Sequence, residues 1–408
     1  MRLLCVLNGG DDHPSTRFRV VQHLPILRAG GIEPDLLVAK REAGYGLLDL
    51  RRRARAADAV LIQKKLFAPF KVALLPRPVP ILFDFDDALF EVSPDEEGRF
   101  GAERARGRMR SRRARLLATA RRARVVIAGN EFLAAWTRAA GARPAGARVE
   151  VLPTGIDLAP FPAHAVEAAA ARRRARRDER RIGWIGSRPS LRYLAALAAP
   201  LRQVCARFPG ARLVQVCSDF IDLPGVPVDR RPWSAATEAR DLLDLDVGLM
   251  PIDDRPFARG KCGLKILQYQ AAGVPVVCSP VGANVDIVRD GETGLHAGDD
   301  RAWVAAISRL LDDREAAARI GAAGRERVAA TYAAPVIGRR LLEIIRAAAG
   351  IRAGRGAAAG DREPASGPDL PGQEGERDQK PEHHERLLVP DHLPERPSFA
   401  AASGVGLQ

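Results

Sequence analysis

The sequence has few of the residues that build disulfide frameworks or metal centres. Among its 408 residues are five cysteines, an odd number, and seven histidines. The cysteines stand at positions 5, 205, 217, 262 and 278, and these spacings match no pattern of metal ligands. Disulfide-rich domains pair their cysteines and zinc sites group them closely, so both classes are excluded. The sequence predicts a reduced, cytoplasmic protein without a metal site.

Long apolar runs are also missing. No run approaches the roughly 20 residues that cross a bilayer. The first residues, MRLLCVLNGG, hold one arginine and no small-residue cleavage site, so they predict a first strand rather than a signal peptide. An apolar fraction of 46% is typical of a globular protein. A chain of 408 residues exceeds one ordinary core, which predicts two domains.

Lysine is scarce, whereas arginine is abundant. Seven lysines stand beside 57 arginines, and residues 1–350 carry 57 basic against 40 acidic side chains, a net charge of +17. Such a charge attracts anionic surfaces in general and identifies no single partner. Aromatic residues make up only 5% of the chain, and none are interleaved with the basic runs. This argues against nucleic acid as a partner.

Short apolar runs alternate along the chain with longer stretches of helical period. Such continuous runs between helices predict an α/β protein with parallel sheets that are covered on both faces. The runs of the first half are LLCVLN, AVLIQ, PILFDFD, VVIAGN and VEVLP, and those of the second are RIGWIG, RLVQVC, DVGLMP and VPVVCSP. We expect two doubly wound, Rossmann-like domains that face each other across a cleft at the carboxyl ends of their strands.

Composition suggests where these domains begin and end. We expect the first domain over residues 1–165 and the second over 181–330. The arginine-rich stretch 166–180 contains no apolar run and is expected to be the linker. Residues 350–408 are rich in Gly, Pro, Glu and Arg without apolar period, so a disordered tail is predicted.

Two stretches of the first half place polar residues at the ends of predicted strands. Gly9 and Gly10 would let backbone N–H groups approach a phosphate or sugar, or would simply form a tight turn. The other candidates on this side are the basic Arg17 and Arg19 and the carboxylates of FDFDDALF, Asp84, Asp86 and Asp87. Strand-end carboxylates bind hydroxyls, move protons or hold a metal. We expect one of Asp86 and Asp87 to cap the following helix and another carboxylate to face the cleft.

Two stretches of the second half predict anion sites at helix N-termini. In IGWIGSRPSLRY, Gly186 and Ser187 end a strand before a helix, with Arg188 nearby. In RGKCGLKILQYQAAG, a helix begins near Gly263 and Leu264 and runs to about residue 272. Lys261 and Lys265 reinforce the positive end of that helix. Two lysines beside a glycine turn favour a diphosphate group as the ligand.

These stretches together resemble the retaining glycosyltransferases of family 4 (glycosyl transferases group 1), a bacterial group with the GT-B fold. DVGLMPIDDRPFARGKCGLKILQYQAAGVPVVCSPVGANVDIVRDGETGLHA is similar to their donor-binding half. STRFRVVQHLPILRAGG, FDFDDALF, NEFLAAWTRAAG and VLPTGIDL are similar to the acceptor half, so the resemblance covers about residues 1 to 348. It implies that the helix over 331–348 returns to the first domain.

The resemblance implies a reaction and its partners. A sugar would pass from a nucleotide-diphosphate donor to a glycan or lipid-linked acceptor with retention of configuration, without a cofactor or metal. The product would serve cell-surface polysaccharide or glycolipid synthesis. Such acceptors lie at the inner leaflet, which would make the protein cytoplasmic with peripheral contact to an anionic membrane.

The resemblance also implies roles for single residues. Lys261, Lys265 and Arg188 would stabilise the charge that develops on the leaving diphosphate. The donor would meet Gly186, Ser187, Trp233, Cys262, Gly263, Leu264, Gln268 and Asp286. Trp233 would offer an aromatic face to the nucleobase or belong to the core. The family's two glutamates, which have seven residues between them, fall here on Gly260 and Gln268, and Gly260 has no side chain to address the sugar.

Other functions account for parts of the sequence. A non-hydrolysing sugar-nucleotide epimerase shares this architecture but needs acid and base side chains beside the sugar. The small number of histidines, seven in the chain, gives such chemistry little support. A non-catalytic basic binding protein with a degenerate donor site explains the arginines but not GKCGLK. A basic helix over 104–124 holds ten arginines and no acidic residue. This helix would pack on the first sheet through Met109, Leu116 and Ala120. Its remaining surface would either be solvated or be attracted to anionic lipid.

Overall fold

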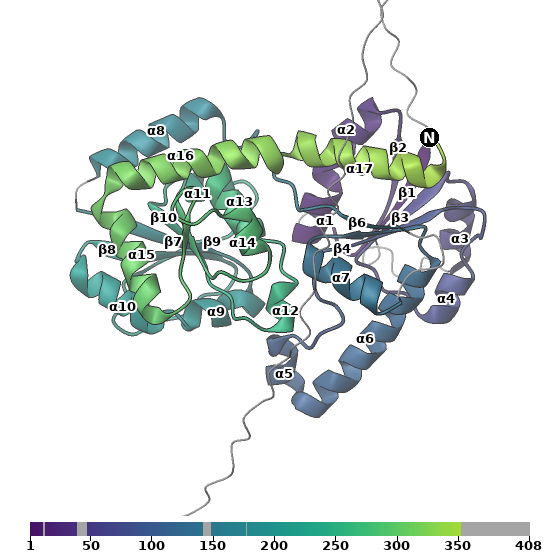
Figure 1. Ribbon diagram of the computed structural model, residues 1–408, viewed down its shortest axis with the longest axis horizontal. Helices are drawn as coiled ribbons and strands as arrows, with labels where there is room; N and C mark the ends of the chain where they lie inside the picture. Colours follow the sequence, from purple (N-terminus) through teal and green to yellow (C-terminus); the bar gives the residue numbers. More distant parts are fainter. Residues whose placement is uncertain (11–12, 39–46, 142–147, 177, 352–408) are drawn as a thin grey trace, which may run out of the picture. The chain divides into compact units, whose positions relative to one another are not determined.

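The computed structural model of this protein describes residues 1–10, 13–38, 47–141, 148–176 and 178–351 (Figure 1). Both of its sheets lie in one compact unit, Met1–Gly354. The predicted tail lies outside the described residues from position 352 onward. In the described part of the chain, no helix is both long and apolar enough to span a bilayer. The five cysteines are free thiols, and four of them are buried.

The first half of the chain forms a six-stranded parallel sheet in the order β2-β1-β3-β4-β5-β6. Its strands are β1 (Arg2–Leu7), β2 (Glu33–Val38), β3 (Ala59–Gln63), β4 (Ile81–Phe85), β5 (Val125–Ala128) and β6 (Arg148–Val151). Its helices are α1 (Pro14–Arg19), η1 (Val21–His23), α2 (Leu24–Ala29), α3 (Leu47–Arg55), α4 (Pro69–Ala73), α5 (Pro94–Phe100), α6 (Ala102–Arg122) and α7 (Glu131–Ala139). In register, Leu3 pairs with Ala59, and Ile62 pairs with Phe83.

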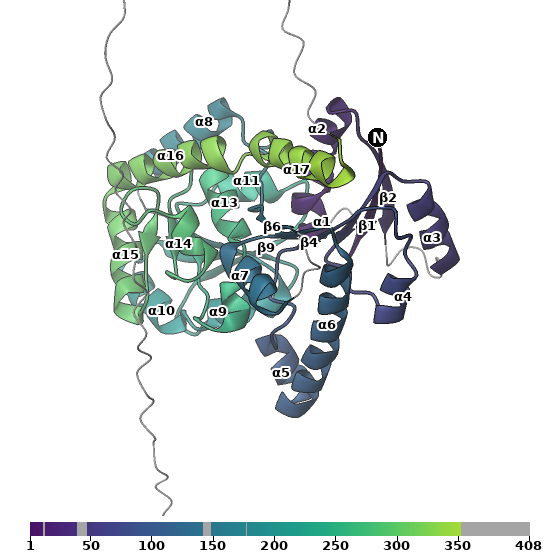
Figure 2. The same ribbon diagram turned by 45° about the vertical axis from the view of Figure 1, so that its right-hand side comes forward.

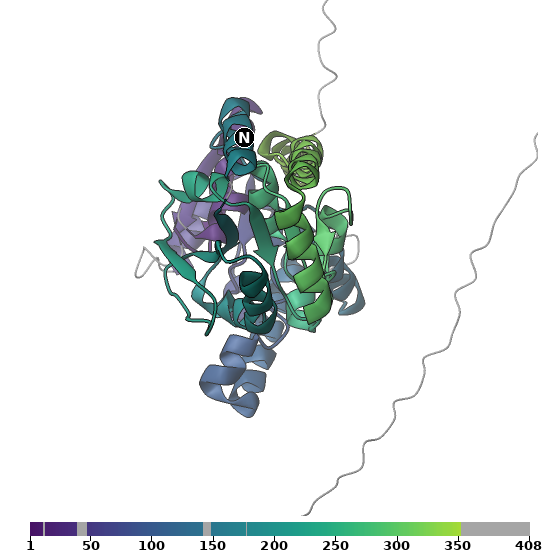
Figure 3. The ribbon, with the colours of Figure 1, turned by 90° about the vertical axis from the view of Figure 1, so that its left-hand side faces the viewer.

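Alternate residues of these strands enter two separate cores. Leu3 and Cys5 of β1 pack with α2, whereas Leu4 and Val6 pack with α3, α4, α6 and α7. The sheet is therefore covered on both faces, as continuous apolar runs predict. The α5–α6 pair, coloured blue, extends away from this sheet in three views (Figures 1, 2 and 3).

The second half forms another six-stranded parallel sheet, in the order β12-β11-β10-β7-β8-β9. Its strands are β7 (Arg180–Ile185), β8 (Ala211–Cys217), β9 (Val228–Pro232), β10 (Val247–Met250), β11 (Val276–Cys278) and β12 (Leu295–His296). Its helices are η2 (Arg188–Ser190), α9 (Leu191–Ala195), α10 (Ala198–Arg207), α11 (Glu238–Leu243), α12 (Pro256–Arg259), α13 (Leu264–Ala271), α14 (Ala283–Ile287), α15 (Asp300–Asp312) and α16 (Arg314–Thr331). The predicted fold class, two doubly wound α/β domains, is confirmed.

Helix α8 (Ala163–Ala175) packs on the second half, and the last helix, α17 (Ala334–Ala349), packs on the first. The stretch expected to be a linker is mostly α8, which buries Val166 and Ala169 against the second half. Helix α17 places Ile337, Leu341 and Ile345 in the same core as β1. The last helix therefore packs on the first sheet, while the domain boundaries themselves stay a prediction.

Candidate functional site

Helix α13 begins at a glycine whose backbone excludes most other residues. Gly263 has a φ of +66°, in the left-handed region, and a Cβ there would lie 2.2 Å from the Cδ1 atom of Ile287. Gly273, with a φ of +63°, follows the last turn of the helix. The helix start at Gly263 and Leu264 and its stop at Gly273 agree with the sequence pattern.

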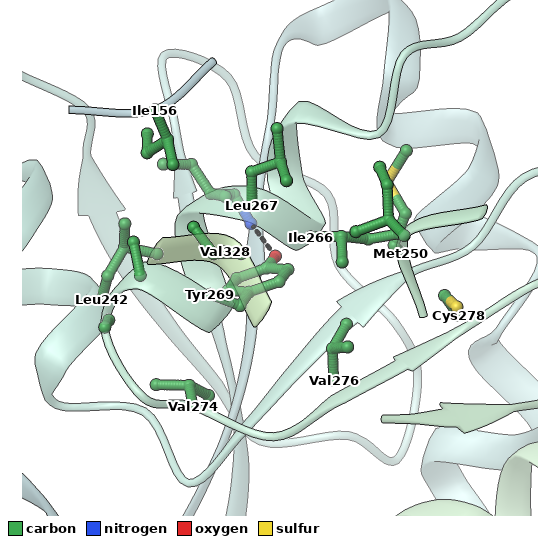
Figure 4. Packing of buried hydrophobic residues seen from close by; sticks show 14 of the residues in the cluster. Ile156, Leu242, Met250, Ile266, Leu267, Tyr269, Val274, Val276, Cys278 and Val328 are labelled. Carbon is green, nitrogen blue, oxygen red and sulfur yellow. Dashed lines mark hydrogen bonds between the residues drawn. The ribbon is translucent and has the colours of Figure 1, made fainter. Parts of the chain in front are cut away.

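Helix α13 is buried on nearly every side rather than along one face. Ile266 and Leu267 lie in the core, and α16 packs against the helix. The Tyr269 hydroxyl donates to the Leu249 carbonyl oxygen at 3.2 Å. It also accepts from the Ile185 N–H group at 2.9 Å, the bond drawn as a dashed line in Figure 4. These bonds fix the helix, and hence the lysines at its start, against β7 and β10.

Lys265 lies against the end of β7, so two predicted anion stretches meet there. Its Nζ atom is 4.9 Å from the centre of the Trp184 ring. A Cβ at Gly186 would lie 2.4 Å from the Trp184 ring and 3.1 Å from the Lys265 Cε atom, so glycine makes room for both side chains. Burial, and then the charge of Lys261, lowers the pKa of Lys265 to about 7. The amine is thus poised to gain a proton when an anion approaches.

Lys261 points to the first half of the chain, where it forms an ion pair. Its Nζ atom lies 3.0 Å from Oδ1 of Asp87, and Oδ2 of Asp87 pairs with Lys64. The Nζ atom of Lys64 also lies 3.0 Å from both Asp86 Oδ1 and Ser15 Oγ. We call Lys64, Asp87 and Lys261 the lysine–aspartate bridge. It joins the end of β4 to the residues before α13.

The expectation that Asp86 or Asp87 caps a helix is wrong. After β4 the chain runs without regular structure to α5, where Ser93 is the N-cap and forms a capping box with Glu96. Both aspartates are free to pair with Lys64 because no helix follows them directly. Among the described residues, no group of three or more His, Cys, Asp or Glu side chains is arranged to hold a metal ion.

Lys64 is a site residue that the sequence analysis missed. It has a φ of +55°, and it is the one non-glycine residue with positive φ in the described ranges. This conformation costs on the order of 1 kcal/mol and turns the side chain toward the aspartates. Its N–H group donates to the Asp84 carbonyl oxygen at 2.7 Å. Two of the seven lysines stand directly after a strand at positions 64 and 65, and this was the available signal.

Arg19 and Asp84, two of the residues expected on the acceptor side, bind each other. Both side chains are buried, at 1% and 5% exposure, and they form a two-point ion pair. Arg19 also donates to the Leu152 carbonyl oxygen at 2.7 Å. The polar atoms of Arg19 and Asp84 thus tie β4 to the segment after β6, and an acceptor-side role for the two residues stays a prediction.

Gly9 and Gly10 form the tight turn that was the alternative interpretation. A Cβ at Gly9 would lie 2.7 Å from the Cβ of His13, and the Thr16 hydroxyl donates to the Gly9 carbonyl oxygen at 3.2 Å. The His13 N–H group donates to the Gly10 carbonyl oxygen at 2.9 Å. The glycines thus close the chain onto α1, and direct contact with a sugar or phosphate stays a prediction.

Arg17 reaches across to the second half of the chain, where it pairs with Glu238. An Arg17 nitrogen lies 3.1 Å from Glu238 Oε1, and Trp233 Nε1–H donates to Glu238 Oε2 at 2.8 Å. Glu238 is 4% exposed, and these partners bind both of its carboxylate oxygens. Trp233 is half-buried at the edge of the core. Glu238 could not be recognised from the sequence, because the residues around it in the chain are those of an ordinary helix surface.

The segment before α13 rests on the first half of the chain. Asn130, also missed from sequence, donates to the carbonyl oxygens of Lys261 at 3.0 Å and Arg259 at 3.2 Å. Its Oδ1 atom accepts from the Leu133 N–H group at 3.0 Å and so caps α7. The Cys262 thiol lies 3.3 Å from the Asp86 carbonyl oxygen. Cys262 therefore packs against the first half, and its contact with a donor stays a prediction.

The other predicted donor residues lie at different depths. Arg188 and Ser187 are exposed, and the Ser187 N–H group donates to Ser190 Oγ at 3.2 Å. That N–H group is therefore already satisfied, and the donor role of Arg188 stays a prediction. Gln268 is buried within α13, whereas Asp286 is exposed on α14.

Sequence comparison relates the second half of the chain to sugar-transferring enzymes. Residues 237–313 match the sequence model of a family described as "Glycosyl transferases group 1". A GDP-mannose-dependent alpha-(1-6)-phosphatidylinositol monomannoside mannosyltransferase of Mycobacterium tuberculosis is 29% identical over 248 residues, 53% of this chain and 60% of that protein. A D-inositol 3-phosphate glycosyltransferase of Salinispora arenicola is 31% identical over 193 residues, 41% of this chain and 42% of that protein. The chain thus spans about half the length of these curated relatives, and the matches support the glycosyltransferase group 1 relationship.

Solved structures share the fold over most of the chain. Sucrose-phosphate synthase from Thermosynechococcus elongatus has a TM-score of 0.62 at 18% identity, covering 85% of this chain and 98% of that one. HepE of Anabaena, in complex with UDP and glucose, has a TM-score of 0.56 at 14% identity, covering 85% and 99%. At these identities the likeness shows the fold, which is GT-B, two Rossmann-like domains.

Proposed function

We propose that this protein is a retaining glycosyltransferase that moves a sugar from a nucleotide-diphosphate donor to a glycan or lipid-linked acceptor, without a metal or other cofactor. The observation that carries the proposal is the position of Lys261 and Lys265 at the start of α13. Lys265 lies against Gly186 at the end of β7, in the half that matches glycosyltransferases. Two cationic side chains and a helix N-terminus suit a diphosphate.

The chemistry of this arrangement is stabilisation of the leaving group. Breaking the bond between sugar and diphosphate develops negative charge on the phosphate oxygens, and fixed donors aimed there lower the barrier. Lys265, with a pKa near 7, takes up a proton as the charge arrives. Arg188, on the exposed η2, is the third predicted cation. Retention and metal independence are supported by the resemblance to family 4.

The remaining parts of the proposal concern recognition. Trp233, held by Glu238 at 2.8 Å, offers an aromatic face for the nucleobase. Relatives named for GDP-mannose and for phosphatidylinositol monomannoside support a sugar-nucleotide donor and a lipid-linked acceptor. We place the protein in the cytoplasm, in peripheral contact with the inner leaflet, where it serves cell-surface polysaccharide or glycolipid synthesis.

Ligand screening of the full chain tests the proposal. UDP, GDP and their sugars are added in a thermal-shift series, and a true donor raises the melting temperature with concentration. Lys261→Ala and Lys265→Ala should each lower the affinity for that ligand about 10- to 100-fold, since each removes a charge-assisted hydrogen bond. Lys71→Ala, on the exposed surface of α4, is the matched control. Unchanged binding in both variants and in their combination would contradict the diphosphate role.

Metal independence has its own test. Transfer should continue in EDTA, because the positive charge at the leaving group comes from side chains. Loss of turnover in EDTA that magnesium or manganese restores would contradict this part of the proposal. It would make Asp86 and Asp87 the candidate metal ligands.

A further inference from the structure

We propose that Asp87 occupies, in the free protein, the place on Lys261 that the donor diphosphate takes, and that Lys64 retains Asp87 when the donor binds. This inference rests on the proposed role of Lys261. It makes Asp87 and Lys64 positioning residues that set the affinity for the donor without touching the sugar.

The charges in and around the bridge are balanced. Asp87 lies between two ammonium groups, with Lys261 at 3.0 Å on one oxygen and Lys64 on the other. Asp86 adds a second carboxylate 3.0 Å from Lys64, so two lysines and two aspartates cancel. The four side chains are only 11–29% exposed, which limits screening by water. A diphosphate cannot bind Lys261 beside Asp87 without strong repulsion between like charges.

Asp87 cannot escape this repulsion by taking up a proton. Burial raises the pKa of its carboxyl, but the charges of Lys261 and Lys64 outweigh burial and hold that pKa well below its ordinary value. Asp87 is therefore ionised in the free protein, and Lys64 continues to favour that charge when a phosphate takes Lys261, so the carboxylate leaves Lys261. It has one partner to keep, because its second oxygen already pairs with Lys64.

Lys64 is fixed in place independently of Asp87. Its Nζ atom has two further partners, Asp86 and the Ser15 hydroxyl, each at 3.0 Å. Its N–H group is bonded to the Asp84 carbonyl oxygen. The ammonium group therefore has no need to follow Lys261, and it retains the displaced carboxylate.

The segment that carries Lys261 is also held by bonds that do not involve the Lys261 side chain. Asn130 binds the backbone carbonyl oxygens of Lys261 and Arg259, at 3.0 and 3.2 Å. The ammonium group can therefore exchange a carboxylate for a phosphate while the backbone stays where it is. This separates the proposal from the simpler interpretation that the bridge only fastens the two halves together.

Opposite effects of two substitutions distinguish the two interpretations. We would measure the binding of UDP and GDP to the full-length protein by isothermal titration calorimetry at constant pH and salt. Asp87→Asn removes the competing charge, so the dissociation constant should fall by about five- to fiftyfold. Lys64→Met leaves Asp87 with Lys261 as its one lysine, so the dissociation constant should rise at least fivefold. Lys64→Arg keeps the charge and should restore affinity toward the wild-type value.

A charge-matched control is available on α5. Glu97 also pairs across the two halves, with Arg255 at 4.0 Å, and touches none of the three bridge residues. Glu97→Gln should leave nucleotide affinity within about twofold. Weaker binding in both Asp87→Asn and Lys64→Met, or no change in Asp87→Asn, would overturn the inference. Failure of the wild-type protein to bind any nucleotide would instead count against the proposed function.

Discussion

Gly260 lies so close to Ala88 that no side chain fits between them. A Cβ at position 260 would come within 2.6 Å of the Ala88 Cβ and 2.7 Å of its backbone nitrogen. The resemblance to family 4 predicts a glutamate at this position, and the close packing of Gly260 on Ala88 leaves no room for its side chain. The carboxylate nearest in sequence to this contact is Asp87, which pairs with Lys261.

The first prediction tests this packing. Gly260→Ala should lower the stability of the protein by about 1–3 kcal/mol, because the backbone of Ala88 cannot yield to an added methyl group without a shift of the chain. Gly107→Ala is the control, since the nearest atom to a Cβ there is a flexible arginine nitrogen at 3.9 Å. That helical change should be neutral or stabilising. Equal urea midpoints for the two variants would contradict the prediction.

Most strands could be predicted from sequence, including the edge strand β6, whereas the edge strands β2, β9 and β12 could not. Continuous apolar runs identified β1, β3, β4, β5, β6, β7, β8, β10 and β11. Strands β2, β9 and β12 were missed because each is short or only half-buried, and β9, with the sequence VDRRP, carries charge. Helix α8 looked like a linker because of its arginines. Arg173 is nevertheless buried, and it donates to the carbonyl oxygens of Leu243 and Gly273.

The local part of the site was predictable and the long-range part was not. Gly263, Lys261 and Lys265 lie within five positions, and glycine and lysine chemistry is enough to recognise a helix start that favours anions. Lys64 and Asn130 lie more than 100 positions from Lys261, and no periodicity connects them. Such contacts depend on how the two sheets pack, which a single sequence does not display.

The second prediction concerns the pH dependence of donor binding. Below pH 7 the Lys265 amine of the free protein is mostly protonated, and above pH 7 it is mostly neutral. Above pH 7 the amine must therefore take up a proton when an anion binds beside it. UDP-glucose and GDP-mannose suit the test, because a diphosphate esterified at both ends does not titrate in this range. The dissociation constant of the true donor should rise about tenfold or more between pH 7 and 9. Lys265→Arg should flatten this slope, since a guanidinium stays charged, and Lys261→Arg should keep it. An identical slope in Lys265→Arg would contradict the prediction.

The third prediction is a loss of stability in mild acid that comes from His23. This side chain is 1% exposed, and burial, followed by the charge of Arg19, lowers its pKa to about 4. Between pH 6.5 and 4 the unfolded chain therefore binds a proton that the native protein does not, so stability falls with pH. The share of His23 between pH 7.5 and 5 is about 2 kcal/mol. His23→Gln should reduce the acid-induced drop in the urea midpoint, and His164→Gln, at an exposed position, should not. Equal drops in all three proteins would refute the assignment.

The last prediction concerns the surface of α6, whose packed side differs from its free side. Leu116 and Ala120 are buried in the first core, as expected, while Met109 is half-buried. Arg112 is turned inward and donates to the carbonyl oxygens of Leu89 and Glu91. The arginines that remain exposed are Arg104, Arg106, Arg108, Arg110, Arg113, Arg115 and Arg121. They make the exposed surface of α6 basic, and α6 extends with α5 away from the first sheet (Figure 2).

The basic surface of α6 should bind anionic lipid bilayers without insertion. Each arginine near such a surface contributes about 1 kcal/mol, and high salt should abolish the effect. The combined variant Arg106→Gln, Arg110→Gln and Arg115→Gln should therefore weaken sedimentation with phosphatidylglycerol vesicles by about 100-fold, while neutral phosphatidylcholine vesicles recover little of any form. A matched triple variant on α15 and α16, Arg301→Gln, Arg309→Gln and Arg319→Gln, removes the same charge from exposed positions in the second half. If both triple variants lose binding equally, net charge rather than α6 accounts for the attraction, and α6 is only a solvated helix.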